Sequence, residues 1–226
     1  MQAFCLMKFI AKQFKQILLT TVFLLCVVPV ISQVRPQSEK SKAITRKRIS
    51  SQLKEFYNLT TQANAVFVFP AGFREIPVTN NEDFPYDYAI ELPGHEFEIW
   101  FQVKSLKENY ADYVRLKNDP TKRIRNPDSL YNDIGQAQAI TFNGDKNYLT
   151  RIIPPDVLKR YNADAGKTYL LNLQDLAETK HYKYALLITL QKDHIGTIIA
   201  VCFSNVKGPE FFKNINKVSK CLKFKP

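Results

Sequence analysis

Hydrophobic and polar positions alternate most strictly between residues 86 and 103. Every second residue from Tyr86 to Leu92 is apolar, and the same holds from Phe97 to Val103, with Pro93 and Gly94 between the two runs. A period of two predicts two antiparallel strands that bury one face, joined here by a turn. The carboxylates of Glu96 and Glu98, on the opposite face of the second strand, are expected to be solvated.

Two later runs differ because they are apolar at nearly every position. Residues 184–190 read Tyr-Ala-Leu-Leu-Ile-Thr-Leu, and residues 197–203 read Thr-Ile-Ile-Ala-Val-Cys-Phe. A strand that is apolar on both faces is covered on both faces. Since residues 193–196 supply a tight turn, we expect these strands to pair in an antiparallel sheet that lies between helical layers.

Several segments with helical spacing are available to form those layers. Residues 105–117 begin with Ser105 and Glu108, a capping-box pair, and residues 126–143 begin with an Asn-Pro pair typical of a capped helix. A shorter helix is expected to end at Tyr161. Residues 209–222 predict a closing helix whose apolar stripe, from Phe211 to Leu222, packs on the sheet.

These elements together predict an α+β fold of one domain over residues 63–226. Further short strands are expected at 65–69, 73–78 and 168–173. The sheet should be mostly antiparallel and covered by helices on both faces. Residues 33–62 are polar and charged with weak apolar spacing, so they predict a basic N-terminal arm or surface helix outside the core.

The first 32 residues have the pattern of a signal peptide. Lys8, Lys12 and Lys15 stand without any acidic residue before the uncharged run 17–31. That run is 15 residues long and contains Pro29, whereas a helix that spans a bilayer needs about 20. We therefore expect cleavage after Ser32, export to a periplasm or the exterior, and no transmembrane span after cleavage.

Composition is that of an ordinary globular protein, with 45% hydrophobic and 23% charged residues. Three of the 32 basic residues lie in the leader, which leaves 29 against 21 acidic residues, and the excess lies at residues 35–54 and 204–226. Such ends are either simply solvated or attract polyanions such as anionic lipid, with export making nucleic acid the least suitable. The candidate binding residues are Arg46, Lys47, Arg48, Lys213, Lys217 and Lys220.

Cys202 and Cys221 are the cysteines that remain after the leader, and export permits a disulfide between them. A closing helix would separate them by about 20 Å at 1.5 Å per residue. Because a disulfide needs Cα atoms within about 7 Å, two buried thiols are expected.

No residue is assigned to a catalytic, cofactor or metal site. The Gly-Lys-Thr triplet at 166–168 resembles the end of a phosphate-binding loop, but Tyr161 stands where that loop needs glycine. His95, His181 and His194 fall in predicted turns or loops without zinc-ligand spacing. A hydrolase stays open as an alternative, and it requires His181 or His194 within about 3.2 Å of a Ser, Cys or Asp side chain inside a cleft.

Trp100 has two interpretations. Exposed beside tyrosines, it would form a platform for a glycan or peptide. Covered by a helix, it would belong to the core, which is the interpretation that we favour.

Four segments resemble uncharacterised exported bacterial proteins. They are Phe-Val-Phe-Pro-Ala-Gly-Phe at 67–73, Tyr-Asp-Tyr-Ala at 86–89, Tyr-Asn-Ala-Asp at 161–164, and the ending 183–194. The order of elements over residues 65–224 is similar to the PsbP-like α/β/α sandwich, named for an extrinsic subunit of photosystem II. The resemblance implies a non-enzymatic accessory or binding role, although fold alone does not fix function. We expect an exported binding protein without a cofactor, acting on an unknown envelope protein or polyanion.

Overall fold

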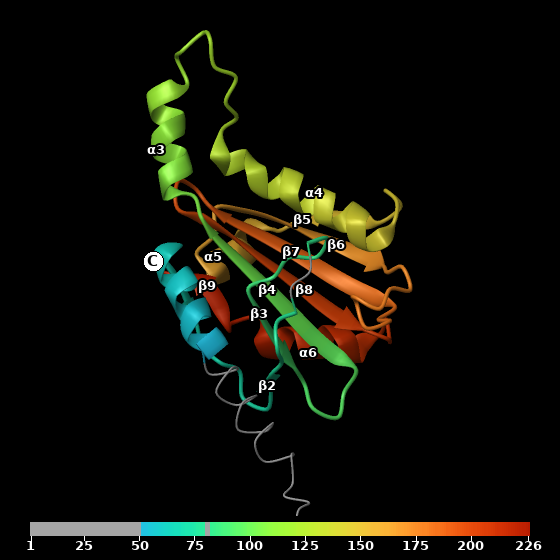
Figure 1. Ribbon diagram of the computed structural model, residues 1–226. Helices are drawn as coiled ribbons and strands as arrows, with labels where there is room; N and C mark the ends of the chain where they lie inside the picture. Colours follow the sequence, from blue (N-terminus) through green and yellow to red (C-terminus); the bar gives the residue numbers. More distant parts are fainter. Residues whose placement is uncertain (1–50, 80–81) are drawn as a thin grey trace, which may run out of the picture. The chain divides into compact units, whose positions relative to one another are not determined.

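The computed structural model describes residues 51–79 and 82–226, which form an α+β fold (Figure 1). The predicted signal peptide lies outside these residues. Seven strands are hydrogen-bonded in the order β2-β3-β4-β8-β7-β6-β5, and each of these pairs is antiparallel. A separate antiparallel pair joins β1 and β9. The prediction of a mostly antiparallel sheet is therefore confirmed.

The strands of the sheet differ in length. Short strands β2 (Arg74–Glu75) and β3 (Tyr88–Glu91) lead to the long strand β4 (Phe97–Ser105). Beyond it lie β8 (Gly196–Ser204), β7 (Tyr184–Lys192), β6 (Ala165–Asn172) and the edge strand β5 (Leu149–Ile152). Ile90 pairs with Ile99 and Leu187 with Val201, so both predicted hairpins are confirmed.

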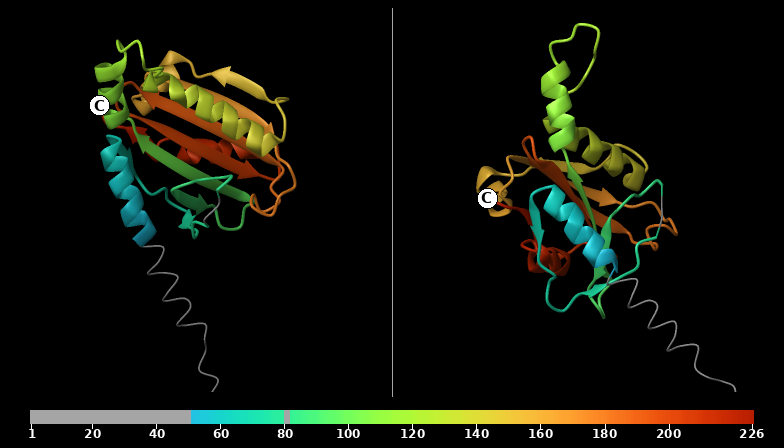
Figure 2. Two further views of the ribbon diagram at one scale, coloured as in Figure 1. Left: turned by 45° about the horizontal axis from the view of Figure 1, so that its top comes forward. Right: turned by 60° about the vertical axis from the view of Figure 1, so that its left-hand side comes forward.

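Each face of the sheet has its own apolar core. On one face, α4 (Leu130–Asn143), which follows the short 3-10 turn η1 (Pro127–Ser129), packs through Ala139 and Phe142. On the other face lie the helix at residues 51–62, α5 (Pro155–Tyr161), α6 (Pro209–Val218) and the pair β1 (Ala65–Phe67) and β9 (Leu222–Phe224), as Figure 2 shows. Because strand side chains alternate between faces, Leu187 belongs to the α4 core and Leu190 to the other.

The helix α3 (Lys107–Leu116) packs on neither face, and none of its residues is buried. It continues from the end of β4 and extends away from the sheet, and residues 117–126 return to η1 (Figures 1 and 2). We call residues 107–126 the arm. The expected capping box is not formed, because Ser105 pairs with Gly196 as the last residue of β4 and Leu106 takes the N-cap position.

The helix at residues 51–62 contributes to the core, which corrects the expectation of a surface element. Phe56 is fully buried, and its ring stacks on Tyr88 at 4.8 Å and meets the edge of Phe67 at 5.1 Å between centroids. Thr60, one turn later, is buried as well. The core therefore begins before Ala63.

The closing helix is shorter than predicted. α6 ends at Val218, and the Cys221 N–H donates to the Val218 carbonyl at 2.9 Å. Leu222 already belongs to β9, where it pairs with Phe67 of β1. Cys202 and Cys221 are buried free thiols, as predicted. The helix that was expected to separate them by continuing to Leu222 ends at Val218, and both cysteines line one hollow beneath α6.

Candidate functional site

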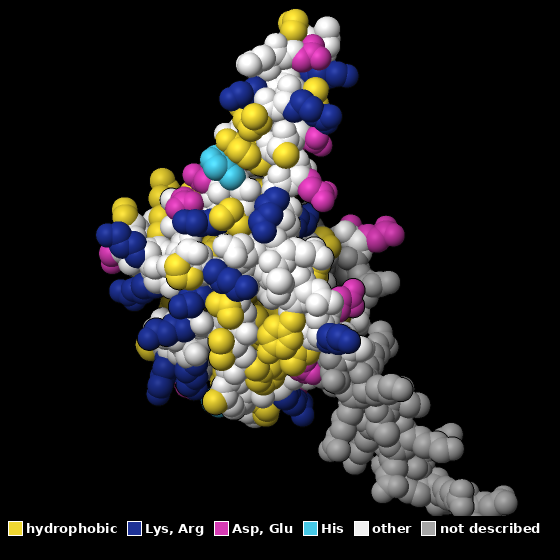
Figure 3. Space-filling view, turned by 90° about the vertical axis from the view of Figure 1, so that its left-hand side faces the viewer, with side chains coloured by type: hydrophobic (Ala, Val, Ile, Leu, Met, Phe, Trp, Pro, Cys, Tyr) yellow, Lys and Arg dark blue, Asp and Glu magenta, His cyan; other side chains and the backbone are white. Residues whose placement is uncertain are grey.

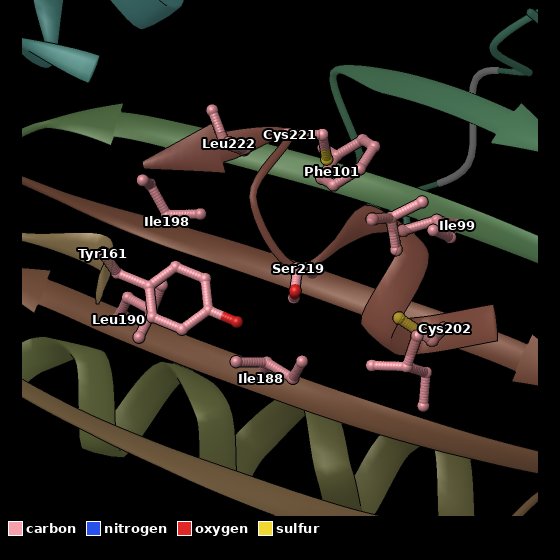
Figure 4. Close-up of a pocket in the computed structure, with 13 residues that line it drawn as sticks. Ile99, Phe101, Tyr161, Ile188, Leu190, Ile198, Cys202, Ser219, Cys221 and Leu222 are labelled. Carbon is pink, nitrogen blue, oxygen red and sulfur yellow. The ribbon is translucent and has the colours of Figure 1, made fainter. Parts of the chain in front are cut away.

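The sheet face opposite α4 has a hollow beneath α6 and the turn that follows it (Figure 4). Its volume is about 40 Å³. Strands β4, β7 and β8 supply the floor, α6 supplies the roof, and Tyr161 from α5 closes one end. The main floor residues are Ile188, Leu190, Ile198 and Ala200, and the roof residues include Ile215 and Val218.

Few polar groups face this hollow. Figure 4 shows the Tyr161 hydroxyl directed into it, and burial raises the pKa of that phenol, so it stays a neutral donor. Burial also raises the pKa of the Cys202 and Cys221 thiols, which keeps them protonated and unreactive. The Ser219 hydroxyl already donates to the Asn216 carbonyl at 2.9 Å. Tyr161 is therefore the group best placed to donate a hydrogen bond to a ligand.

A second, open hollow of about 280 Å³ lies between α6 and the edge strand β5. The strand register shows that it adjoins the first. Leu149, Leu170, Leu186 and Cys202 are successive cross-strand partners, and so are Arg151, Thr168, Ile188 and Ala200. Cross-strand partners share a face with Cβ atoms about 5 Å apart. Two rows of side chains therefore run from β5 to beneath α6, and we call this surface the trough.

The outer part of the trough is apolar and uncovered, and a charged side chain stands at its rim. Leu149 is 64% exposed and Phe212, on α6, is 44% exposed, while Leu170 and Leu186 are half-buried between them. Arg151 is exposed at the rim and forms no ion pair with any described residue. Exposed apolar surface of this kind, framed by polar groups, is typical of a binding groove.

The basic residues predicted from the sequence lie elsewhere. Lys213, Lys217 and Lys220 are exposed, as expected, and none of them lines the trough. The Lys217 ammonium donates to the Asn214 side chain at 2.9 Å. The other three residues, Arg46, Lys47 and Arg48, lie outside the described residues, so convergence of the two basic ends stays a prediction.

Each histidine lies beside a carboxylate. His194 Nδ1 is 2.8 Å from Asp128 Oδ2, and His181 Nδ1 is 2.6 Å from Asp175 Oδ1. Asp128 also accepts the backbone N–H of His194 at 2.7 Å. These bonds hold the turn between β7 and β8 against η1, so the His194 pair has a structural role.

The distance required by the hydrolase alternative is thus met, and the His181 pair lines a hollow of about 420 Å³, but that hollow supplies no nucleophile beside the pair. His181 and Asp175 are both exposed, in an open depression with Leu173, Tyr182 and Lys183 that offers no Ser or Cys side chain. In residues 51–79 and 82–226, no group of three or more His, Cys, Asp or Glu side chains is arranged to hold a metal ion. The trough is therefore the stronger candidate site.

Glu98 corrects the expectation of a solvated strand face. Its side chain is 1% exposed, the Trp100 indole N–H donates to Oε1 at 2.5 Å, and the Lys180 ammonium lies 2.7 Å from Oε2. Glu96 is exposed, as predicted. Trp100 is buried and stacks on Tyr86 at 4.1 Å between centroids, which confirms its core interpretation. The Glu98 carboxylate is therefore bound by Trp100 and Lys180 within the fold and is not available to a substrate.

Sequence reasoning missed the strand that forms the open side of the trough. Residues 148–153 read Tyr-Leu-Thr-Arg-Ile-Ile between the turn at Gly144 and Pro154, which is a recognisable strand signal. No local pattern, however, indicates that α6 leaves this strand uncovered.

No protein-family model matches the chain, and a search of curated proteins finds no match. In the part of the chain that the structure describes, no helix has both the length and the apolar character needed to cross a membrane. The geometry of the trough is thus the main indication of function.

Proposed function

We propose that the protein is an exported binding protein that holds a small amphiphile in the trough. The apolar chain of the ligand would lie along the two cross-strand rows, with its inner end near Tyr161. Its anionic head would meet Arg151 at the rim. The observation that carries this proposal is the continuity of an apolar floor from the edge strand to beneath α6, with a single cation at its open end.

The size of the trough limits the ligand. Four neighbouring strands at about 4.8 Å spacing span roughly 14 Å, which suits a chain of about ten carbons. Taken together, the hollows of about 40 and 280 Å³ come close to the lower end of ordinary ligand pockets, which is about 300 Å³. Each buried methylene contributes about 0.8 kcal/mol before the cost of association, so the apolar chain supplies most of the affinity and Arg151 fixes its direction.

We also propose that the protein is exported and that its fold is the PsbP-like α/β/α sandwich. Export is supported by the charge and hydropathy pattern of residues 1–32. The sandwich is supported by the order of elements and by helices on both sheet faces. A non-enzymatic accessory role at the cell envelope fits a trough without a nucleophile, since the thiols that line it are protonated.

Displacement of a fluorescent fatty-acid probe by decanoate, with decanol as the uncharged comparison, tests this function on the full chain. Ala200→Leu places a larger side chain on the floor beneath α6 and is expected to weaken both ligands at least tenfold. Arg151→Gln should weaken decanoate severalfold and leave decanol unchanged, because it removes charge but little apolar surface. Lys183→Gln, an exposed cation outside the trough, is the matched control.

Equal binding of both ligands by wild type and Ala200→Leu would contradict the proposal, as would failure of the wild type to bind either one. If Arg151→Gln and Lys183→Gln lower decanoate binding alike, the head interacts with overall charge and not with the rim of the trough.

A further inference from the structure

The arm is a second surface, and it shares no residue with the trough. Figure 3 shows it projecting from the body, with Lys and Arg side chains, hydrophobic side chains and some acidic side chains on its surface. None of the residues of α3 is buried. At its base, the Tyr110 ring stacks on His194 at 3.7 Å between centroids, with an interplanar angle of 28°. The two ends of the arm therefore join the body, at β4 and at η1, and its tip projects away from the body.

The end of α3 and the segment that returns from it to η1 are strongly basic. Residues 115–126 contain five cations and only one acidic residue, Asp119. Arg115 pairs with Asp112 at 2.7 Å and Arg125 with Asp133 at 2.9 Å. The other three cations are exposed and form no ion pair with any described residue; they are Lys117, Lys122 and Arg123.

Apolar side chains are exposed among these cations. Val114 is 46% exposed and Ile124, which stands between Arg123 and Arg125, is 39% exposed. A surface that binds only polyanions gains nothing from an exposed isoleucine. At a bilayer, by contrast, basic side chains meet anionic headgroups while neighbouring apolar side chains enter the acyl boundary.

We infer that the arm docks the protein on an anionic lipid surface, with Lys117, Lys122 and Arg123 against headgroups and Ile124 in the interface. The charge of the arm and its projection from the body carry this inference, which does not depend on a ligand in the trough. It also differs from the expectation that the two ends of the chain form the basic surface, because the arm lies in the middle of the sequence.

Co-sedimentation of the full chain with phosphatidylcholine vesicles, with and without one third phosphatidylglycerol, tests the inference. The variant Lys117→Gln/Lys122→Gln/Arg123→Gln is expected to reduce partition onto the anionic vesicles by roughly 100-fold, at about fivefold for each basic residue near the surface. The matched variant Lys213→Gln/Lys217→Gln/Lys220→Gln loses the same charge from α6 and its turn. It is expected to keep most of the binding.

Two further measurements show whether the arm is the part that binds, and whether it prefers lipid to other anions. Anionic vesicles should slow hydrogen exchange in peptides from residues 107–126 and leave α6 unchanged. Ile124→Ser should weaken vesicle binding severalfold without changing retention on heparin. The inference is overturned if the wild type binds heparin but not anionic vesicles, if both triple variants lose binding equally, or if the arm gains no protection.

Discussion

The two faces of the sheet are built from the same strands, yet they are filled differently. Under α4 the hollow beside Trp100 and Phe142 measures about 10 Å³, and Trp100, Phe142 and Phe203 make ring contacts with centroids 4.6 to 6.4 Å apart. On the other face the hollows measure about 40 and 280 Å³. The covering helices differ in length, with 14 residues in α4 and 10 in α6. The elements that cover this face leave apolar side chains of β5 and β6 open beside α6.

The strongest way to break this comparison uses two adjacent leucines of β7. Leu187 is fully buried under α4, whereas Leu186 is half-buried in the trough. Leu187→Ala should lower the free energy of unfolding by about 3–5 kcal/mol because it leaves a closed cavity, and Leu186→Ala by only about 1 kcal/mol because water and neighbours reach the site. Urea denaturation measures both, and equal losses would mean that the two faces are packed alike.

Thiol reactivity examines the closed end of the trough. Burial raises the pKa of Cys221 to about 12 and moves the pKa of Cys202 in the same direction. At pH 8 both should react with iodoacetamide roughly 100-fold or more slowly than in the unfolded chain, since each pKa unit lowers the thiolate fraction about tenfold. The native rate should keep rising with pH above 9, where the unfolded rate levels off. Fast native alkylation, measured by mass spectrometry, would show that α6 lifts readily.

Glu98 sharpens the comparison from the α4 side. Glu98→Ala should cost about 2 kcal/mol, because the buried Trp100 N–H loses its acceptor and the Lys180 cation loses its partner. Glu96→Ala, at an exposed position of the same strand, should stay within about 0.5 kcal/mol of wild type. Thermal unfolding of the two variants measures both losses of stability. A Glu98→Ala variant as stable as wild type would show that the packing under α4 does not depend on this carboxylate.

The smallest effect is expected from filling the trough. Ala200→Val adds volume beside the hollow of about 40 Å³ and should raise stability by about 0.5–1 kcal/mol. Ala185→Val makes the same change at a fully buried site under α4 and should lower stability by about 1–3 kcal/mol through overpacking. Calorimetry should therefore show that Ala200→Val raises the stability and that Ala185→Val lowers it. Changes in the same direction would contradict the difference in packing between the two faces.

Much of the fold was predictable from local pattern. The hairpin at residues 86–103 and the strands at 184–190 and 197–203 were recognisable because alternation and continuous apolar runs report directly on burial. Phe56 was not, because its burial depends on Tyr88 and Phe67, which lie far along the chain. The three-residue strand β9 is likewise defined by its pairing with β1 and has no length of its own to recognise.

The candidate site was less predictable than the fold. Lys180 reaches Glu98 across 82 positions, so a face that looks solvated in sequence is closed by a distant loop. The trough depends on where α6 ends relative to β5, and neither segment contains that information. Its floor residues are ordinary strand positions, all of them apolar except Arg151 and Thr168, so no motif marks it.

Methyl NMR of the protein titrated with decanoate tests the binding function of the trough most directly. The methyl groups of Leu170, Leu186 and Ile188 should shift progressively with ligand, whereas those of Leu187 and Ile199, on the opposite face of the same strands, should not. Shifts on both faces, or on neither at millimolar decanoate, would contradict a binding site between α6 and the edge strand.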